Sequence, residues 1–235
     1  MNWTVFAGLA IVGFLILCAV AYVYLLGTVV EEGMENQQTD DCKVLERIPT
    51  EDGLIEIVDE WCKEGLPHTT DSNTIRMTRQ KYDSQRLPSL LVHERIHLDQ
   101  KRNPTKWAEF YKQYWDYDIQ YESPVPDVYA KHLRPNPDTA ANPWAIWRQR
   151  WVFFPYTETG GLQAANVRIW DLFENTFVPV PEQWKARFCD ADGCPHQYEH
   201  PHELSAELWT DPTKSVASAQ LTRWYKAQRS PIRSE

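Results

Sequence analysis

Residues 87–104 read LPSLLVHERIHLDQKRNP, and this stretch decides the fold. Pro88 near its start and the Asn103-Pro104 pair near its end predict a helix between them. Proline is tolerated in the first helical turn, and elsewhere it ends a helix. Leucine, isoleucine and valine are spread through the stretch, so we expect this helix to be buried.

The same stretch contains an H-E-x-x-H motif, formed by His93, Glu94 and His97. Positions four residues apart lie on one face of a helix, so both imidazoles can reach one metal ion at about 2.0–2.1 Å. Glu94 sits beside the first histidine, where a carboxylate can act on a metal-activated water without being a ligand. An exposed helix with polar groups facing water is the simpler interpretation. The apolar neighbours argue against it, because buried imidazole and carboxylate groups need partners.

A third ligand has to come from elsewhere in the chain. The long zincin pattern would place glycine at position 100 and histidine at 103, but the chain has Gln100 and Asn103, which excludes that pattern. Residues 200–207 read HPHELSAE, where Pro201 predicts another helix start. Glu203 in this segment is a candidate ligand, although a carboxylate at a helix N-terminus is also favoured by the helix dipole alone. Other candidates are His200, His202 and Glu122.

Together, the segments 87–104 and 198–208 resemble the gluzincin metallopeptidases. The resemblance implies a zincin-like domain that holds Zn²⁺ through His93, His97 and Glu203, with Glu94 as the catalytic base. It also implies that Glu207 orients a ligand histidine from outside the metal's coordination shell. The chain departs from the pattern in having Glu207 where aspartate is usual. The long separation between His97 and Glu203 implies a sizeable insert. The pair of motifs is also similar to a poorly characterised group of metallopeptidase-like proteins of large DNA viruses.

The function predicted from this resemblance is zinc-dependent hydrolysis of peptide bonds in a peptide or protein substrate. Tyr198 and His202 are candidate donors to the oxyanion, with His200 and His132 as further candidates. Each of these side chains is individually more typical of a structural role. Two alternatives stay open: a non-catalytic protein with a structural or degenerate zinc site, and a membrane-tethered binding domain.

Residues 1–30 contain no charged side chain and are almost wholly apolar from residue 5 onward. A run of this length is long enough to cross a bilayer. We therefore expect a transmembrane anchor at 1–30, a polar stalk at 31–41 and one domain at 42–235. A cleaved signal peptide is the rival interpretation. The expected localisation is a single-pass membrane protein whose C-terminal domain is non-cytoplasmic.

Four cysteines fall in that domain, and an even number outside the cytoplasm predicts two disulfides. Three pairings are possible, and sequence proximity favours Cys42–Cys62 and Cys189–Cys194. A second zinc site formed by Cys189, Cys194 and His196 is the alternative, but it lacks an identifiable fourth ligand.

The net charge of −9 argues against a nucleic-acid surface, which would need clustered lysine and arginine. Residues 54–58 fit either a helix or a strand, and a strand is expected near 75–77. Aromatic residues spaced three and four apart from Trp107 to Trp115 predict a second helix. Residues 118–147 and 181–200 look irregular, 151–156 and 167–180 read as strands, and helices are expected at 202–210 and 214–228. The predicted fold class is thus α+β: a mostly helical zincin-like domain with a small β-hairpin or sheet insert.

Overall fold

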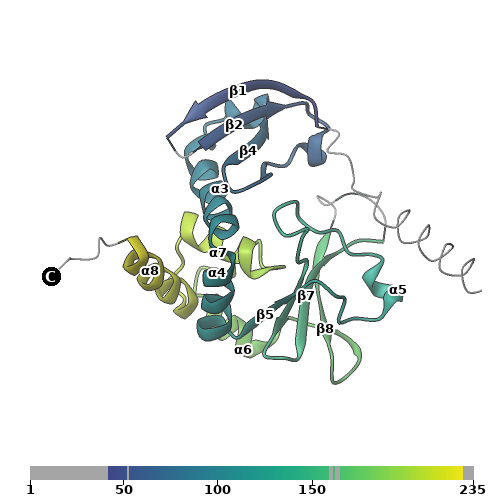
Figure 1. The fold of residues 1–235 in the computed structure, drawn as a ribbon. Coiled ribbons are helices and arrows are strands. Elements are labelled where there is room, and N and C mark those ends of the chain that lie inside the picture. Colours follow the sequence, from purple (N-terminus) through teal and green to yellow (C-terminus); the bar gives the residue numbers. More distant parts are fainter. Residues whose placement is uncertain (1–41, 52, 159–160, 162–164, 230–235) are drawn as a thin grey trace, which may run out of the picture. The chain divides into compact units, whose positions relative to one another are not determined.

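The computed structural model describes residues 42–51, 53–158, 161 and 165–229. Within these residues, nine strands form two separate sheets, so the domain is not mostly helical and the predicted fold class is wrong on this point (Figure 1). The β content was underestimated because several strands are only two to four residues long and lie in proline-rich segments.

The first sheet has four strands in the order β1-β2-β4-β3. Their bounds are Val44–Thr50 (β1), Gly53–Val58 (β2), Thr74–Thr78 (β4) and His68–Thr69 (β3). The central pair, β2 and β4, is parallel, and both outer pairings are antiparallel. Ile55, Ile57 and Met77 are buried against Leu98 of helix α3 (Leu87–Arg102). The ambiguous run at 54–58 is therefore a central strand, and the strand expected at 75–77 is confirmed.

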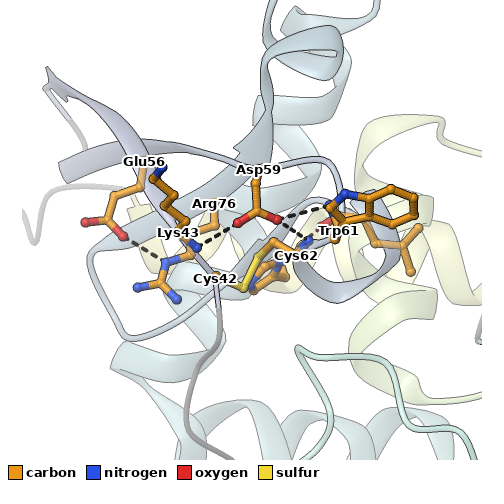
Figure 2. Close-up of a disulfide and its surroundings, with 9 residues drawn as sticks. Cys42, Lys43, Glu56, Asp59, Trp61, Cys62 and Arg76 are labelled. Carbon is orange, nitrogen blue, oxygen red and sulfur yellow. Dashed lines mark hydrogen bonds and ion pairs between the residues drawn. A yellow bond between two sulfur atoms is a disulfide. The ribbon is translucent and has the colours of Figure 1, made fainter.

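A disulfide between Cys42 and Cys62 ties the start of this sheet to the 3-10 turn η1 (Cys62–Gly65). Figure 2 shows how Asp59 organises the joint. Its carboxylate accepts hydrogen bonds from the backbone N–H groups of Lys43 at 2.8 Å, Trp61 at 3.1 Å and Cys62 at 3.0 Å. The second disulfide joins Cys189 to Cys194, so the pairing favoured by sequence proximity is confirmed for both.

Helices α3 and α4 follow the first sheet, after the four-residue helix α2 (Arg79–Tyr82). Helix α3 (Leu87–Arg102) begins and ends where its prolines predict. Helix α4 (Pro104–Phe110) continues into a π-helical turn, η2 (Tyr111–Trp115), so the predicted second helix is present. Its aromatic side chains lie in the largest hydrophobic core, as their spacing predicts.

The second sheet is an antiparallel meander with the strand order β5-β6-β7-β8-β9. The strands are Tyr117–Gln120 (β5), Trp144–Trp147 (β6), Trp151–Tyr156 (β7), Asn166–Asp171 (β8) and Thr176–Val178 (β9). Alternate side chains divide between two cores: Trp147 and Phe153 pack with the helices, whereas Ile146 and Phe154 pack on the opposite face. This two-residue period is typical of a strand buried on both faces. Helix α5 (Asp127–Ala130) lies in the β5–β6 connection.

Three helices complete the described chain: α6 (Glu182–Phe188), α7 (Pro201–Thr210) and α8 (Val216–Arg229). The last two match the predicted helices closely, whereas α6 replaces a predicted loop. Helix α7 packs directly against α3, which brings the two motif segments together.

The prediction of a membrane-spanning helix is not supported. None of the helices built from the described residues is both long and apolar enough to cross a bilayer. The segments 1–30 and 31–41, where the anchor and stalk were expected, lie outside the described residues. We therefore do not retain the localisation as a single-pass membrane protein, whereas the bilayer as a partner of residues 1–30 stays a prediction.

Candidate metal centre

Helix α3 presents two imidazoles at one point. His93 and His97 lie one turn apart, and their Nε2 atoms approach to 3.1 Å. His97 is buried, whereas His93 is partly open, with 14% of its side chain exposed. Two Nε2 lone pairs at this distance repel each other unless a proton or a metal ion lies between them.

Helix α7 supplies the carboxylate. The helix starts at Pro201, and His200 caps it by accepting a hydrogen bond from the backbone N–H of His202 at its Nδ1. Glu203 therefore falls in the first turn, where the positive end of the helix dipole favours a negative charge. Its Oε2 atom lies 3.4 Å from the Nε2 atom of His93 and 3.4 Å from that of His97.

These three atoms form a triangle of the size that one metal ion needs. Two atoms bound at about 2.0–2.1 Å to one tetrahedral zinc ion lie roughly 3.3–3.4 Å apart. The observed edges are 3.1, 3.4 and 3.4 Å. Both carboxylate oxygens of Glu203 are buried and have no hydrogen-bond donor among the described residues. A buried carboxylate that accepts no hydrogen bond is costly, so the residues fit a bound cation.

The pKa values of the residues in this triangle are shifted in the directions that a cation site favours. Burial alone would lower the pKa of His97, but the carboxylates of Glu203, Asp138 and Glu94 together outweigh burial and raise that pKa to about 10. Burial would raise the pKa of Glu203, yet His97 and His93 hold it well below its usual value. The pair therefore favours a positive charge at the imidazoles, which a proton or a metal ion can provide.

Gln100 fixes the orientation of His97 and was missed from the sequence. Its Nε2 atom donates to the backbone carbonyl of His202 at 3.1 Å, and a carbonyl can only accept. The amide oxygen must therefore be the atom that faces His97, at 2.7 Å from its Nδ1. Nδ1 consequently carries the proton, which leaves the Nε2 lone pair directed at the triangle. The i+3 spacing of Gln100 from His97 is the signal that could have revealed it.

Glu94 lies beside the triangle without belonging to it. It is buried, and its Oε2 atom has no hydrogen-bond partner in the described part of the chain. Burial raises the pKa of Glu94 well above the usual range, and the nearby Asp138 carboxylate raises it further. Asp138 comes from the β5–β6 connection and is held by the backbone N–H of Thr69 and by Lys101. No sequence signal connects Asp138 to the motif.

A pocket of about 460 Å³ opens onto these groups. His93, Glu94, Asp138 and Glu203 contribute to its wall. The remaining lining residues are mostly polar or basic: Leu66, Pro67, Gln80, Lys81, Ser84, Arg86, Ser89, Leu90, Asn136, Gln197 and Thr210. The structure therefore joins His93, His97, Glu203 and Glu94 in one site that opens into this pocket.

Glu207 lies elsewhere than the gluzincin resemblance implies. Its two carboxylate oxygens accept hydrogen bonds from the backbone N–H groups of His196 at 2.7 Å and Gln197 at 2.5 Å. It thus holds the loop before α7, and Gln100 takes the orienting role that was expected of Glu207.

The predicted oxyanion donors do not line the pocket. Tyr198 packs its ring on Phe153 and Trp184 in the main core. His202 stacks near Tyr111 and His200, and burial keeps its pKa well below the usual value, so it is neutral. Both side chains therefore pack against other rings and do not face the pocket.

The other candidates also lie outside the triangle. His200 acts as the cap of α7, His132 packs against Tyr156, and Glu122 is exposed. A carboxylate that sequence reasoning missed, Glu199, is buried near the site. Burial, together with the charge of Glu203, raises its pKa to about 8.

The four cysteines of the described residues do not form a second metal site. Cys189 and Cys194 are joined to each other, so they offer no thiolate to His196. Cys42, Cys62 and His68 also lie close together, but the disulfide leaves His68 as the sole free ligand of that group.

No protein-family model, curated protein or solved structure matches this chain. The resemblance to gluzincins therefore rests on the motif residues alone.

Proposed function

We propose that the protein is a zinc-dependent peptidase whose metal is held by His93, His97 and Glu203. The observation that supports this most directly is the triangle of ligand atoms, with edges of 3.1, 3.4 and 3.4 Å. Among the described residues, no fourth histidine, cysteine, aspartate or glutamate joins this group. Structural zinc sites usually have four protein ligands, whereas catalytic sites have three and leave one position open.

A bound zinc ion would polarise the scissile carbonyl and activate a water molecule for attack. Glu94 lines the pocket beside the ligands, and a cation in the triangle would favour its deprotonated form, so its carboxylate would accept the proton from the attacking water. The C–N bond then breaks, and Glu94 returns this proton to the leaving amine. Gln100 keeps the His97 ring fixed throughout, because its hydrogen bond to Nδ1 does not involve the reacting atoms.

Metal analysis tests the ligand set. We expect about one zinc ion per full-length chain after reconstitution, and loss of that ion in Glu203→Gln, because the amide has no charge to offset the metal. Glu207→Gln is the matched control. It removes the same charge one turn further along α7, and it should keep the ion because Glu207 contacts only backbone amides. Equal zinc content in both variants would contradict the proposed ligand set.

Hydrolysis tests the role of Glu94. With a library of quenched fluorescent peptides, Glu94→Gln should lower kcat by about 10²–10⁴ while zinc content stays the same, since it removes proton transfer alone. A zinc-loaded wild-type chain that cleaves no peptide would exclude the peptidase function.

A further inference from the structure

Two basic side chains line the pocket without an acidic partner. Lys81 lies in α2 and Arg86 at the N-cap of α3, and both are exposed at the pocket wall. Neither makes an ion pair with any described residue. Their basic neighbours differ: Arg79 pairs with Glu46 and Asp83, and Lys101 pairs with Asp138. The chain has a net charge of −9, so acidic residues outnumber basic ones. Two cations without an ion pair to a described residue in one pocket therefore set this pocket apart from the chain's overall acidic character.

Two of the three acidic residues that line the pocket have cationic partners or face the imidazoles, and the third, Glu94, is buried beside the ligand triangle. Asp138 is bound by Lys101 and by Thr69. Glu203 faces the two imidazoles and the position of the metal. At the exposed wall of the pocket, Lys81 and Arg86 are therefore the cations that make no ion pair with a described residue. Helix α3 adds to them, because its first turn has neither a side-chain cap nor an acidic residue.

Helix geometry gives the distance of this positive region from the ligands. Arg86, Leu90 and His93 recur at intervals of four and three residues, so they lie on one face of α3. Seven residues of helix between Arg86 and His93 span about 10 Å. An extended peptide advances about 3.3 Å per residue, so this span corresponds to about three substrate residues. Ser89 and Leu90 form the pocket wall between the two points.

We infer that the pocket selects peptides bearing a carboxylate about three residues from the scissile bond, where Lys81 and Arg86 bind it. This inference rests on the proposed peptidase function, and it adds the substrate class. The carboxylate can belong to an aspartate or glutamate side chain or to a free C-terminus, since both offer the same charge and the same two acceptor oxygens.

A peptide series measures the preference directly. A single glutamate is moved through positions up to four residues on either side of the cleavage site, in peptides with an amidated C-terminus. Each peptide has a glutamine twin, and a third set is neutral except for a free C-terminal carboxylate. We expect kcat/KM about three- to tenfold higher for glutamate than for glutamine, greatest near the third position on one side and smaller at high salt.

Variants locate the preference. In Lys81→Gln/Arg86→Gln the glutamate-to-glutamine ratio should fall to about one, because no unpaired cation remains in the pocket. Lys131→Gln/Arg134→Gln is the charge-matched control: both residues are exposed, outside the pocket lining, and should leave the ratio as in wild type. A response of the third peptide set alone identifies the C-terminal carboxylate as the preferred source.

The outcomes separate this inference from the peptidase proposal. Zinc-dependent cleavage with no preference for a carboxylate overturns the inference and leaves the peptidase function standing. If no peptide is cleaved, the peptidase proposal fails, and binding decides the inference. Fluorescence anisotropy with the zinc-loaded Glu94→Gln chain should then show at least threefold tighter binding of the glutamate peptide, lost when Lys81 and Arg86 are also replaced. Equal binding of the twin peptides overturns the inference.

Discussion

At the scale of single residues, the amide of Gln100 sets the chemistry of the site. Besides the His202 carbonyl, its Nε2 atom contacts the hydroxyl of Tyr111 at 3.0 Å and that of Ser205 at 2.9 Å. Gln100, Tyr111 and Ser205 are buried, so the amide cannot exchange these hydroxyl groups for water. One side chain thus connects α3, η2 and α7, and at the same time it selects the tautomer of His97, which we propose as a metal ligand.

Replacement of Gln100 by methionine should keep the volume of the side chain and remove the hydrogen bond to His97 Nδ1. We expect the zinc dissociation constant to rise by about 10- to 100-fold, since lost outer-shell hydrogen bonds have effects of this size. Competition with a chromophoric chelator measures it. Gln113→Met, on the exposed side of η2, is the control and should bind zinc like wild type. An unchanged constant in Gln100→Met would remove Gln100 from the orienting role.

At the scale of helices and strands, the local signals differ in strength. Helix α7 begins at Pro201, and α3 begins at Leu87, one residue before Pro88, so the sequence suffices to place both helices and their motifs. Strands β5 and β6 have four residues each, too few for a two-residue period to stand out in a proline-rich segment. Helix α6 has seven residues, about two turns, which is too short for its helical period to stand out in the sequence.

The same limit applies to the site. The ligand residues follow from spacing along one helix and from the start of another. Asp138, Lys81 and Arg86 reach the pocket through tertiary packing, which no local pattern records. The role expected of Glu207 was wrong, because a carboxylate one turn from Glu203 points to the preceding loop instead of to a histidine.

The turn between β8 and β9 depends on the charge of one buried carboxylate. Burial would raise the pKa of Asp171, but the N–H groups of Glu174 and Phe173, with Arg150, outweigh it and lower that pKa below 3.8. A lowered native pKa means that this stabilisation is present above about pH 3.8, the value in the unfolded chain, and is lost as the pH falls through the native pKa.

Asp171→Asn should therefore lower the free energy of unfolding by about 1–2 kcal/mol at pH 7, because the charged hydrogen bond to Arg150 is lost. The difference from wild type should shrink below pH 3.8, where the wild-type carboxyl also becomes protonated in the unfolded chain. Urea unfolding at pH 7 and pH 3 measures both values. Asp118→Asn, which breaks a surface pair with Lys112, should cost less than about 1 kcal/mol. A constant difference at both pH values would contradict this account.

At the scale of the whole molecule, the metal should act as a stabilising ligand. The carboxylate oxygens of Glu203 accept no hydrogen bond from a described residue, and they lie where α3 and α7 pack together. The free-energy cost of burying them therefore weakens the contact between the two motif segments. A cation bound there removes this cost in the folded state alone. Binding to the folded state at a thousandfold excess over the dissociation constant stabilises a protein by about 4 kcal/mol.

For a domain of this size, that stabilisation corresponds to a rise in Tm of roughly 8–16 °C on adding zinc. Scanning calorimetry with the full-length chain, in zinc and in chelator, measures the shift. Glu203→Gln should show almost no shift, whereas Glu207→Gln should show the wild-type shift. A zinc-independent Tm in the wild type would mean that the triangle does not bind the ion in the folded state.

The unequal exposure of the three ligands gives ion exchange a direction. His97 and Glu203 are each about 1% exposed, and only His93, at 14%, borders open solvent among the three. Ions and chelators should therefore enter and leave along the His93 side, through the opening of the pocket that we propose as the substrate site. A peptide bound in that opening would block this route. The protein with a bound peptide should therefore lose its ion to a chelator more slowly than the protein without one.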